Sequence, residues 1–156
     1  MAIRLLDENG SGNISDAINA WSYALLQGAT VINNSWGALG IEPSQVNFME
    51  EAIDIGEEVF GAVFVAAAGN ESVNTDQIAN TPSNANGMIS VGASNKKNRK
   101  RAKFSNVGRN TVDLFAPGVN ISSVNAFSTS SLIAFSGTSM AAPIVAGAAA
   151  ILQDRS

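Results

Sequence analysis

The sequence predicts an α/β domain in which a mainly parallel sheet is flanked by helices. The chain has 156 residues, of which 46% are hydrophobic, so its size and composition suit one domain with its own core. Segments with apolar residues at helical spacing alternate with short β-branched segments, and this order favours the α/β class. Residues 62–68 are apolar on both faces, which is typical of a central parallel strand.

The first helix is expected to begin at Ser15, which is a suitable N-cap residue. Ile14 and Ile18 flank this serine and would form a hydrophobic staple. The apolar positions of the helix are Ile18, Trp21 and Leu25. Gly28 provides the stop signal, so the helix should end near that residue.

Strand and helix segments continue to alternate after this helix. A β-branched strand is expected over residues 30–35, followed by a loop over residues 37–44. The second helix has apolar positions at Val46, Met49, Ile53 and Phe60. After the central strand, further strands are expected at 88–93 and 112–116, and a last helix at about 139–153. No repeat or linker interrupts the chain, so residues 1–156 form one predicted domain.

Cysteine and histidine are absent from the chain, and each absence excludes a class of chemistry. Without cysteine, the chain has no disulfide, thiolate nucleophile or cysteine-ligated metal. Without histidine, it has no imidazole base and cannot contain a Ser-His-Asp triad by itself. No run of about 20 uncharged apolar residues occurs, so the sequence predicts no membrane span.

Charge is unevenly distributed along the chain, whose formal net charge is −4. Residues 1–76 hold eleven of the thirteen acidic residues and a single base, Arg4. Six of the nine bases lie between Lys96 and Lys103. Nucleic-acid-binding segments normally join such a basic run to aromatic residues or a fold motif, and only Phe104 is near. We therefore expect an exposed loop between two strands and no nucleic-acid partner.

The first candidate for chemistry is the segment FSGTSMAAP, in which Ser139 opens the last helix. A serine in the first turn lies at the positive end of the helix dipole, beside backbone amides without a helical acceptor. These amides could stabilise an oxyanion if Ser139 attacked a carbonyl group. Taken alone, the same serine is better explained as a helix N-cap.

The second candidate is Asn70, which follows the buried strand in the segment AAAGNE. Ligands of parallel α/β sheets bind at the carboxyl ends of the strands, where this side chain would stand. Its amide could donate to an oxyanion, a contact worth roughly 3–4 kcal/mol in a transition state. Taken alone, Asn70 also fits an ordinary turn.

Two further segments have glycines where an extended peptide could approach the backbone closely. Each segment by itself is better explained as a loop built from turn residues. The two segments are Gly10-Ser11-Gly12 and Ser35-Trp36-Gly37.

Taken together and in this order, the segments resemble the subtilisin-like serine peptidases, the subtilase family. The order is Gly-Ser-Gly, VINNSWG, VAAAGNE, FAPG and SGTSMAAPIVAGAAA, and it covers essentially the whole chain. The resemblance implies that Ser139 is the nucleophile, and that the Asn70 side chain and the Ser139 backbone amide are the oxyanion donors. It also implies that residues 10–12 and 35–37 are the two substrate-pairing edges. The implied wall of the primary specificity pocket consists of Ala67, Ala68 and Gly69.

The resemblance also implies that part of the domain is missing, because the family's catalytic aspartate and histidine lie on earlier segments. The chain is expected to begin near the strand that leads into Gly10-Ser11-Gly12. It would then be the carboxyl-terminal portion of a subtilase domain from a secreted or cell-surface endopeptidase. Its partners would be a peptide or protein substrate and the missing amino-terminal part. The sheet edge left open leads us to expect a homo-oligomer.

Two alternatives and one cofactor question stay open. The chain could be non-catalytic, as a pseudoenzyme or a peptide-binding scaffold that keeps the edges and lacks the base. It could also be part of a sedolisin, a family that pairs a similar serine with a glutamate, although Asn70 stands where sedolisins place an aspartate. Subtilases often bind calcium, but residues 7–13 lack the glutamate at loop position twelve, where Ile18 stands. No cofactor or metal ligand is therefore assigned.

Overall fold

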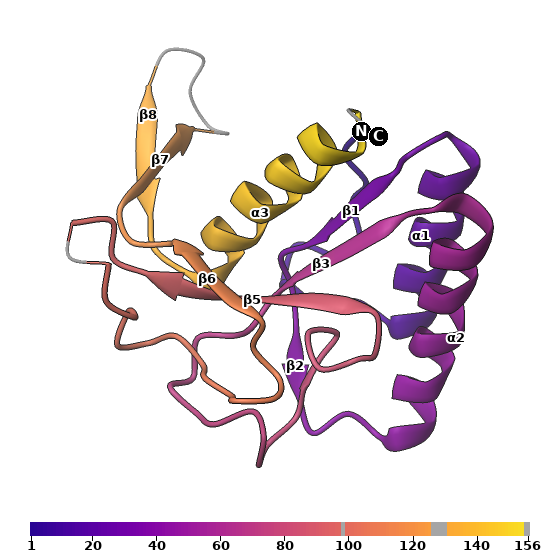
Figure 1. Ribbon diagram of the computed structural model, residues 1–156, viewed down its shortest axis with the longest axis horizontal. Coiled ribbons are helices and arrows are strands. Elements are labelled where there is room, and N and C mark those ends of the chain that lie inside the picture. The colour runs from indigo at the N-terminus through magenta and orange to yellow at the C-terminus, as the bar shows by residue number, and fades with distance from the viewer. Residues whose placement is uncertain (98, 126–130, 155–156) are drawn as a thin grey trace.

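A four-stranded parallel sheet forms the centre of the computed structural model, which describes residues 1–97, 99–125 and 131–154 (Figure 1). The strands lie in the order β1, β3, β5, β6, and each neighbouring pair is parallel. Their bounds are Val31–Asn34 for β1, Val63–Ala67 for β3, Met88–Ser94 for β5 and Leu114–Pro117 for β6. The predicted fold class is confirmed, and the predicted strands differ from the observed ones by one or two residues at their ends.

Helices cover both faces of this sheet. They are α1 (Ile14–Leu26), α2 (Pro43–Phe60) and α3 (Thr138–Gln153). Figure 1 shows α1 and α2 on one face and α3 on the other. Alternation along β3 explains the layers, because Phe64 and Ala66 join the core cluster of α1 and α2. Val65 and Ala67 point the other way and join the cluster that includes α3, so the central strand is buried on both faces.

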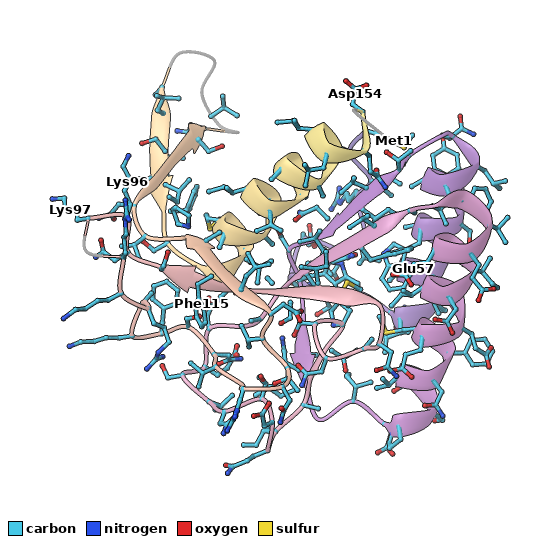
Figure 2. All side chains as sticks on the ribbon, viewed as in Figure 1. Met1, Glu57, Lys96, Lys97, Phe115 and Asp154 are labelled. Atoms are coloured by element: carbon cyan, nitrogen blue, oxygen red, sulfur yellow. The ribbon has the colours of Figure 1, made fainter. Side chains whose placement is uncertain are left out.

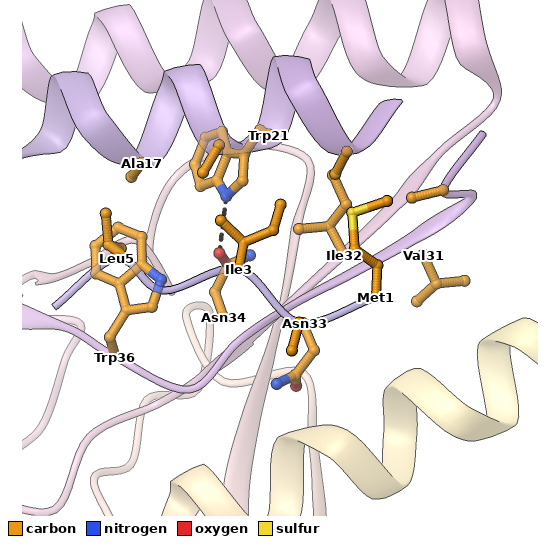
Figure 3. A pocket seen from close by; sticks show the side chains of 14 residues that line it. Met1, Ile3, Leu5, Ala17, Trp21, Val31, Ile32, Asn33, Asn34 and Trp36 are labelled. Carbon is orange, nitrogen blue, oxygen red and sulfur yellow. Dashed lines mark hydrogen bonds between the residues drawn. The ribbon is translucent and has the colours of Figure 1, made fainter. Parts of the chain in front are cut away.

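The layer of α1 and α2 packs closely on the sheet through one small residue and two aromatic residues. A Cβ atom at Gly56 of α2 would lie 2.6 Å from the ring of Phe64, so only glycine permits this approach. The Phe64 ring meets Trp21 of α1 edge-on, with ring centroids 5.4 Å apart. The Trp21 Nε1–H donates to Oδ1 of the buried Asn34 at 2.8 Å (Figure 3), which ties α1 to the carboxyl end of β1.

The predicted start of the first helix is wrong. Asn13, rather than Ser15, is the N-cap, because its backbone is extended and its carbonyl oxygen accepts the Ala17 N–H at 3.2 Å. Ile14 and Ile18 consequently both lie inside the helix. They pack against the core instead of forming a staple across the helix start.

Two short antiparallel pairs lie outside the main sheet and were not predicted. β2 (Ala38–Leu39), which lies inside the expected loop of residues 37–44, pairs with β4 (Asn80–Thr81). β7 (Ile121–Val124) pairs with β8 (Leu132–Phe135). The first pair is two residues long and joins distant segments, and the second is mostly exposed, so neither shows a periodic buried face in the sequence.

The amino-terminal segment does not form the strand that was expected to lead into Gly10. A strand needs a neighbour for its backbone N–H and C=O groups, and among the described residues β1 pairs only with β3. Residues 1–5 instead run beside α1 and β1, and the three enclose a cavity of about 410 Å³ (Figure 3). The free edge of β1 lies along this cavity.

The basic segment is an exposed loop between β5 and β6, as expected. Lys96 and Lys97 are exposed there, whereas Asn98 lies outside the described residues. Figure 2 places both lysines at the opposite end of the molecule from Glu57 of α2. In the described part of the chain, no helix is long and apolar enough to cross a membrane.

Two buried serines on or near β5 differ in how their hydroxyl groups are satisfied. The Ser90 hydroxyl has no hydrogen-bond partner among the described residues, although the residue is only 1% exposed. The Ser105 hydroxyl accepts the Ala93 N–H at 2.9 Å and donates to the Asn106 carbonyl oxygen at 3.0 Å.

We predict opposite effects of removing these two hydroxyl groups. Ser90→Ala should raise the free energy of unfolding by about 1 kcal/mol, because it removes an unpaired buried polar group. Ser105→Ala should lower it by about 1–3 kcal/mol, because it leaves the Ala93 amide unpaired in a buried strand. Urea unfolding at one protein concentration measures both. Equal destabilisation by the two substitutions would contradict the prediction.

Candidate active site

Ser139 lies in the first turn of α3, which begins one residue earlier than expected. Gly137 is the N-cap, and Thr138 is the first helical residue. The first backbone N–H groups of a helix have no acceptor within it, so the Ser139 N–H is available to a ligand. Ser139 is half-buried, so its hydroxyl group stays within reach of the surface.

Two reciprocal hydrogen bonds join Ser139 to Ser35 at the carboxyl end of β1. The Ser139 hydroxyl donates to the Ser35 carbonyl oxygen at 3.2 Å, and the Ser35 hydroxyl donates to the Ser139 carbonyl oxygen at 3.0 Å. The second bond replaces a helical one, because Pro143 has no N–H to offer that carbonyl. The Asn33 side chain donates to the Ser35 hydroxyl at 2.9 Å and orients it.

Asn70, at the carboxyl end of β3, holds the same turn from the other side. Its Oδ1 accepts the Thr138 N–H at 2.8 Å and the Thr138 hydroxyl at 3.1 Å. The Thr138 hydroxyl in turn accepts the Gly69 N–H at 3.1 Å. A backbone N–H can only donate, so the contact with Thr138 assigns Oδ1 and leaves Nδ2 pointing elsewhere. Among the described residues, no hydrogen bond uses Nδ2, so this donor is free.

The predicted pocket wall is formed by buried backbone. Ala67 and Ala68 are 4% and 0% exposed, whereas Gly69 is half-buried. The side chain of Asn80 lies between Gly69 and Gly37, since a Cβ atom at these glycines would lie 3.2 and 3.1 Å from its Nδ2. Asn80 thus connects the predicted pocket wall with one of the predicted substrate edges.

The two predicted substrate edges line one cleft. A cavity of about 370 Å³ is lined by Gly10, Ser11 and Gly12 on one side and by Trp36 and Gly37 on the other. Ser35 is not part of this lining, and its hydroxyl and carbonyl groups are hydrogen-bonded to Ser139. The structure therefore brings five of the six predicted edge residues to a common groove, and their role in pairing with a substrate stays a prediction.

The first of these edges is held by a carboxylate. Asp7 Oδ1 accepts the backbone N–H groups of Ser11 at 2.9 Å and of Asn9 at 2.8 Å. These bonds, that from Ser11 first and that from Asn9 second, hold the pKa of Asp7 below its ordinary value. Asp7 therefore stabilises the turn that carries Ser11.

In the described residues, no group of three or more histidines, aspartates or glutamates lies together as a metal site.

Three residues contact the site through side chains that the sequence did not mark as candidates, although Thr138 lies within the SGTSMAAP segment. Asn80, Asn106 and Thr138 are at most 2% exposed. Their side chains all form hydrogen bonds to the segment that follows β3. Buried, hydrogen-bonded amides do not differ from turn residues in a sequence, so only the spatial contacts identify them.

The arrangement contains a serine hydroxyl, two free amide donors and a separate cleft, but no base faces the hydroxyl among the described residues. Ser139 donates to a carbonyl oxygen, which cannot accept its proton at neutral pH, and the sequence contains no histidine.

Comparison with known proteins gives the family. The sequence model of the Subtilase family matches residues 1–156. The chain belongs to the subtilase family. It is 41% identical over 152 residues to a thermophilic serine proteinase from Bacillus sp. (strain AK1). It is 37% identical over 152 residues to subtilisin DY from Bacillus licheniformis. The resemblance predicted from the sequence is confirmed.

This subtilase chain corresponds to part of its relatives. The two matches cover 97% of the chain but only 35% and 52% of the respective relatives. A solved structure described as a cold adapted subtilisin-like serine proteinase superposes with a TM-score of 0.81 at 32% identity. That superposition covers 97% of this chain and 52% of the solved chain.

Proposed function

We propose that this chain is the part of a subtilase serine endopeptidase that carries the nucleophile, the oxyanion hole and the substrate-pairing edges. One observation carries the proposal: Ser139 and Asn70 meet at the first turn of α3, where Asn70 Oδ1 is held and its Nδ2 is free. In a family of serine peptidases, this arrangement is suited to stabilising an oxyanion.

The proposed reaction is acyl transfer from a peptide bond to Ser139 and then to water. The Ser139 oxygen attacks the substrate carbonyl carbon, and the carbonyl oxygen becomes an oxyanion. Asn70 Nδ2 and the Ser139 N–H donate to that oxygen. A base takes the hydroxyl proton and passes it to the leaving amine as the C–N bond breaks. Water, activated by the same base, then hydrolyses the acyl-enzyme.

We assign the base and its partner carboxylate to the amino-terminal part of the domain, as the family resemblance implies. The substrate would pair as an extended strand with residues 10–12 and 35–37 across the cleft, and its side chain would enter the pocket walled by residues 67–69. The same resemblance suggests a secreted or cell-surface parent protein.

A second function from a different class is a non-catalytic peptide-binding scaffold. The contact of the Ser139 hydroxyl with a carbonyl oxygen favours it for this chain in isolation, because the serine is not activated. The upstream coding sequence distinguishes the two, since an in-frame aspartate and histidine in the family's spacing would support the peptidase. The Asn70 side chain and the subtilase match both speak against the sedolisin alternative.

We predict that the isolated chain has no measurable peptidase activity. An unactivated serine hydroxyl is a weak nucleophile, and the oxyanion donors alone leave only a small acceleration. Incubation with casein and with a fluorophosphonate probe tests this, with Ser139→Ala as the control for site-specific labelling. Stoichiometric labelling of Ser139, or turnover that Ser139→Ala abolishes, would show that this prediction is wrong.

In a protein that also carries the amino-terminal part, Asn70→Ala should lower kcat by about 10²–10³ with little change in KM. The reason is that an oxyanion donor acts on the transition state more than on the bound substrate. Asn110→Ala is a matched control, because Asn110 is exposed and its backbone N–H, rather than its side chain, contacts Asp76. Equal kcat values for Asn70→Ala and the wild type would remove Asn70 from the mechanism.

The isolated chain exposes an apolar surface that we expect another polypeptide segment to bury. The free edge of β1 borders a cavity of about 410 Å³. On the adjacent face, Ile144, Ile151 and Leu152 of α3 are 44%, 58% and 70% exposed. Soluble monomers rarely expose a large apolar patch together with an open sheet edge. We propose that the amino-terminal part covers this region in the parent and that a second copy covers it in the isolated chain.

The isolated chain should therefore associate in a concentration-dependent way, as light scattering at several concentrations would show. Ile151→Lys should weaken the association, because it places a charge in the patch. Val59→Lys is the matched control, since Val59 is 70% exposed on α2 in the opposite layer. A monodisperse monomer that unfolds cooperatively and binds no hydrophobic dye would refute the account.

A further inference from the structure

Asn106 is a fully buried amide whose hydrogen bonds all go to the segment around Asn70. Its Nδ2 donates to the Ala68 carbonyl oxygen at 2.9 Å and to Glu71 Oε2 at 2.7 Å. Its Oδ1 accepts the backbone N–H groups of Glu71 at 3.0 Å and Val73 at 3.1 Å. A side-chain amide has two donor and two acceptor positions, so all four are occupied.

The backbone of Asn106 adds a fifth hydrogen bond, and its side chain restricts the space beside Gly69. Its N–H donates to the Gly69 carbonyl oxygen at 3.0 Å. Gly69 has a φ of +98°, and a Cβ atom there would collide with Nδ2 of Asn106 and with Glu71. The amide therefore occupies the space that a side chain at Gly69 would need. The chain is held on both sides of Asn70, yet no hydrogen bond joins Asn106 to Asn70 itself.

Asn106 is itself anchored to the sheet. Its carbonyl oxygen accepts the Ser105 hydroxyl at 3.0 Å, and that hydroxyl accepts the Ala93 N–H of β5 at 2.9 Å. A chain of hydrogen bonds thus runs from β5 through Ser105 and Asn106 to the loop after β3. Asn70 and Glu71 are exposed, and the Asn106 side chain accepts the backbone N–H of Glu71, the residue next to Asn70.

We infer that Asn106 is a positioning residue for the oxyanion hole, an inference that rests on the proposed function. Thr138 fixes the Oδ1 end of the Asn70 side chain, and Asn106 fixes the backbone from which that side chain extends. Both ends must be held, because an oxyanion donor is effective only within about 2.7–3.1 Å of the developing charge. Asn106 acts without touching the substrate.

The test is a double-mutant cycle in the protein that carries this chain together with its amino-terminal part. Asn106→Asp keeps the shape but loses both donors, so the Ala68 carbonyl and the Glu71 carboxylate lose their partner. We expect kcat to fall by about 10–100-fold with little change in KM. In the Asn70→Ala background, the same substitution should change kcat by less than about 2-fold, because the donor that it displaces is already gone.

A pH profile provides a readout that general loss of structure would not produce. The new carboxylate would lie against that of Glu71, and two carboxylates this close share a proton as the pH falls. The shared proton restores a donor, so the ratio of variant to wild-type kcat should rise toward acid. Asn110→Asp introduces the same charge at an exposed asparagine and should leave this ratio flat.

Should Asn106→Asp fail to fold, Glu71→Ala supplies the same cycle, since it removes one partner of Asn106 through an exposed side chain. Glu71→Ala should lower kcat by less than Asn106→Asp does, and this loss should likewise disappear in the Asn70→Ala background. The inference would be overturned if the fold-loss in kcat of a double variant equalled the product of the losses of its two single variants. An unchanged kcat in Asn106→Asp would also overturn it. An unchanged kcat in Asn70→Ala alone would instead overturn the proposed function.

Discussion

The clamp on the first turn of α3 is the constraint on which the candidate site depends. Ser35 holds this turn from the end of β1, and Asn70 holds it from the end of β3. β1 and β3 are paired in parallel, with Asn34 opposite Ala66, so their carboxyl ends reach the same edge of the sheet. Pro143 leaves the Ser139 carbonyl without a helical donor, which makes the contact with Ser35 possible.

Three buried asparagines form hydrogen bonds that join further elements to the strands next to this turn. Asn34 joins β1 to α1 and to the Val65 carbonyl, and Asn80 joins β4 to the Ala68 carbonyl. Asn106 joins the β5–β6 connection to the loop after β3. Each is at most 2% exposed, and a buried amide is costly unless its partners are in place. Their hydrogen bonds therefore favour one arrangement of the loops at the carboxyl edge of the sheet.

The same architecture leaves the β1 edge of the main sheet unpaired among the described residues. The sheet ends at β1, and α3 covers the other face while exposing Ile144, Ile151 and Leu152. A subtilase relative of which this chain spans about half has further chain with which to cover such a surface. The Ser139 hydroxyl, the free Asn70 amide donor and the cleft thus all lie within the chain, whereas our proposal assigns the base and the cover for the apolar surface to an amino-terminal part of the domain.

Local pattern by itself determined the helices, the central strand and the identities of Ser139 and Asn70 as candidates. Apolar periodicity and short motifs are properties of neighbouring residues, so no knowledge of distant contacts is needed to find them. The tertiary structure decided the β2–β4 pair, the absence of a strand before Gly10, and the contacts of Thr138, Asn80 and Asn106. Asn106 meets Glu71 across 35 residues, and Thr138 meets Asn70 across 68. Such hydrogen bonds depend on how the strands are ordered in the sheet, which the local pattern of residues does not encode.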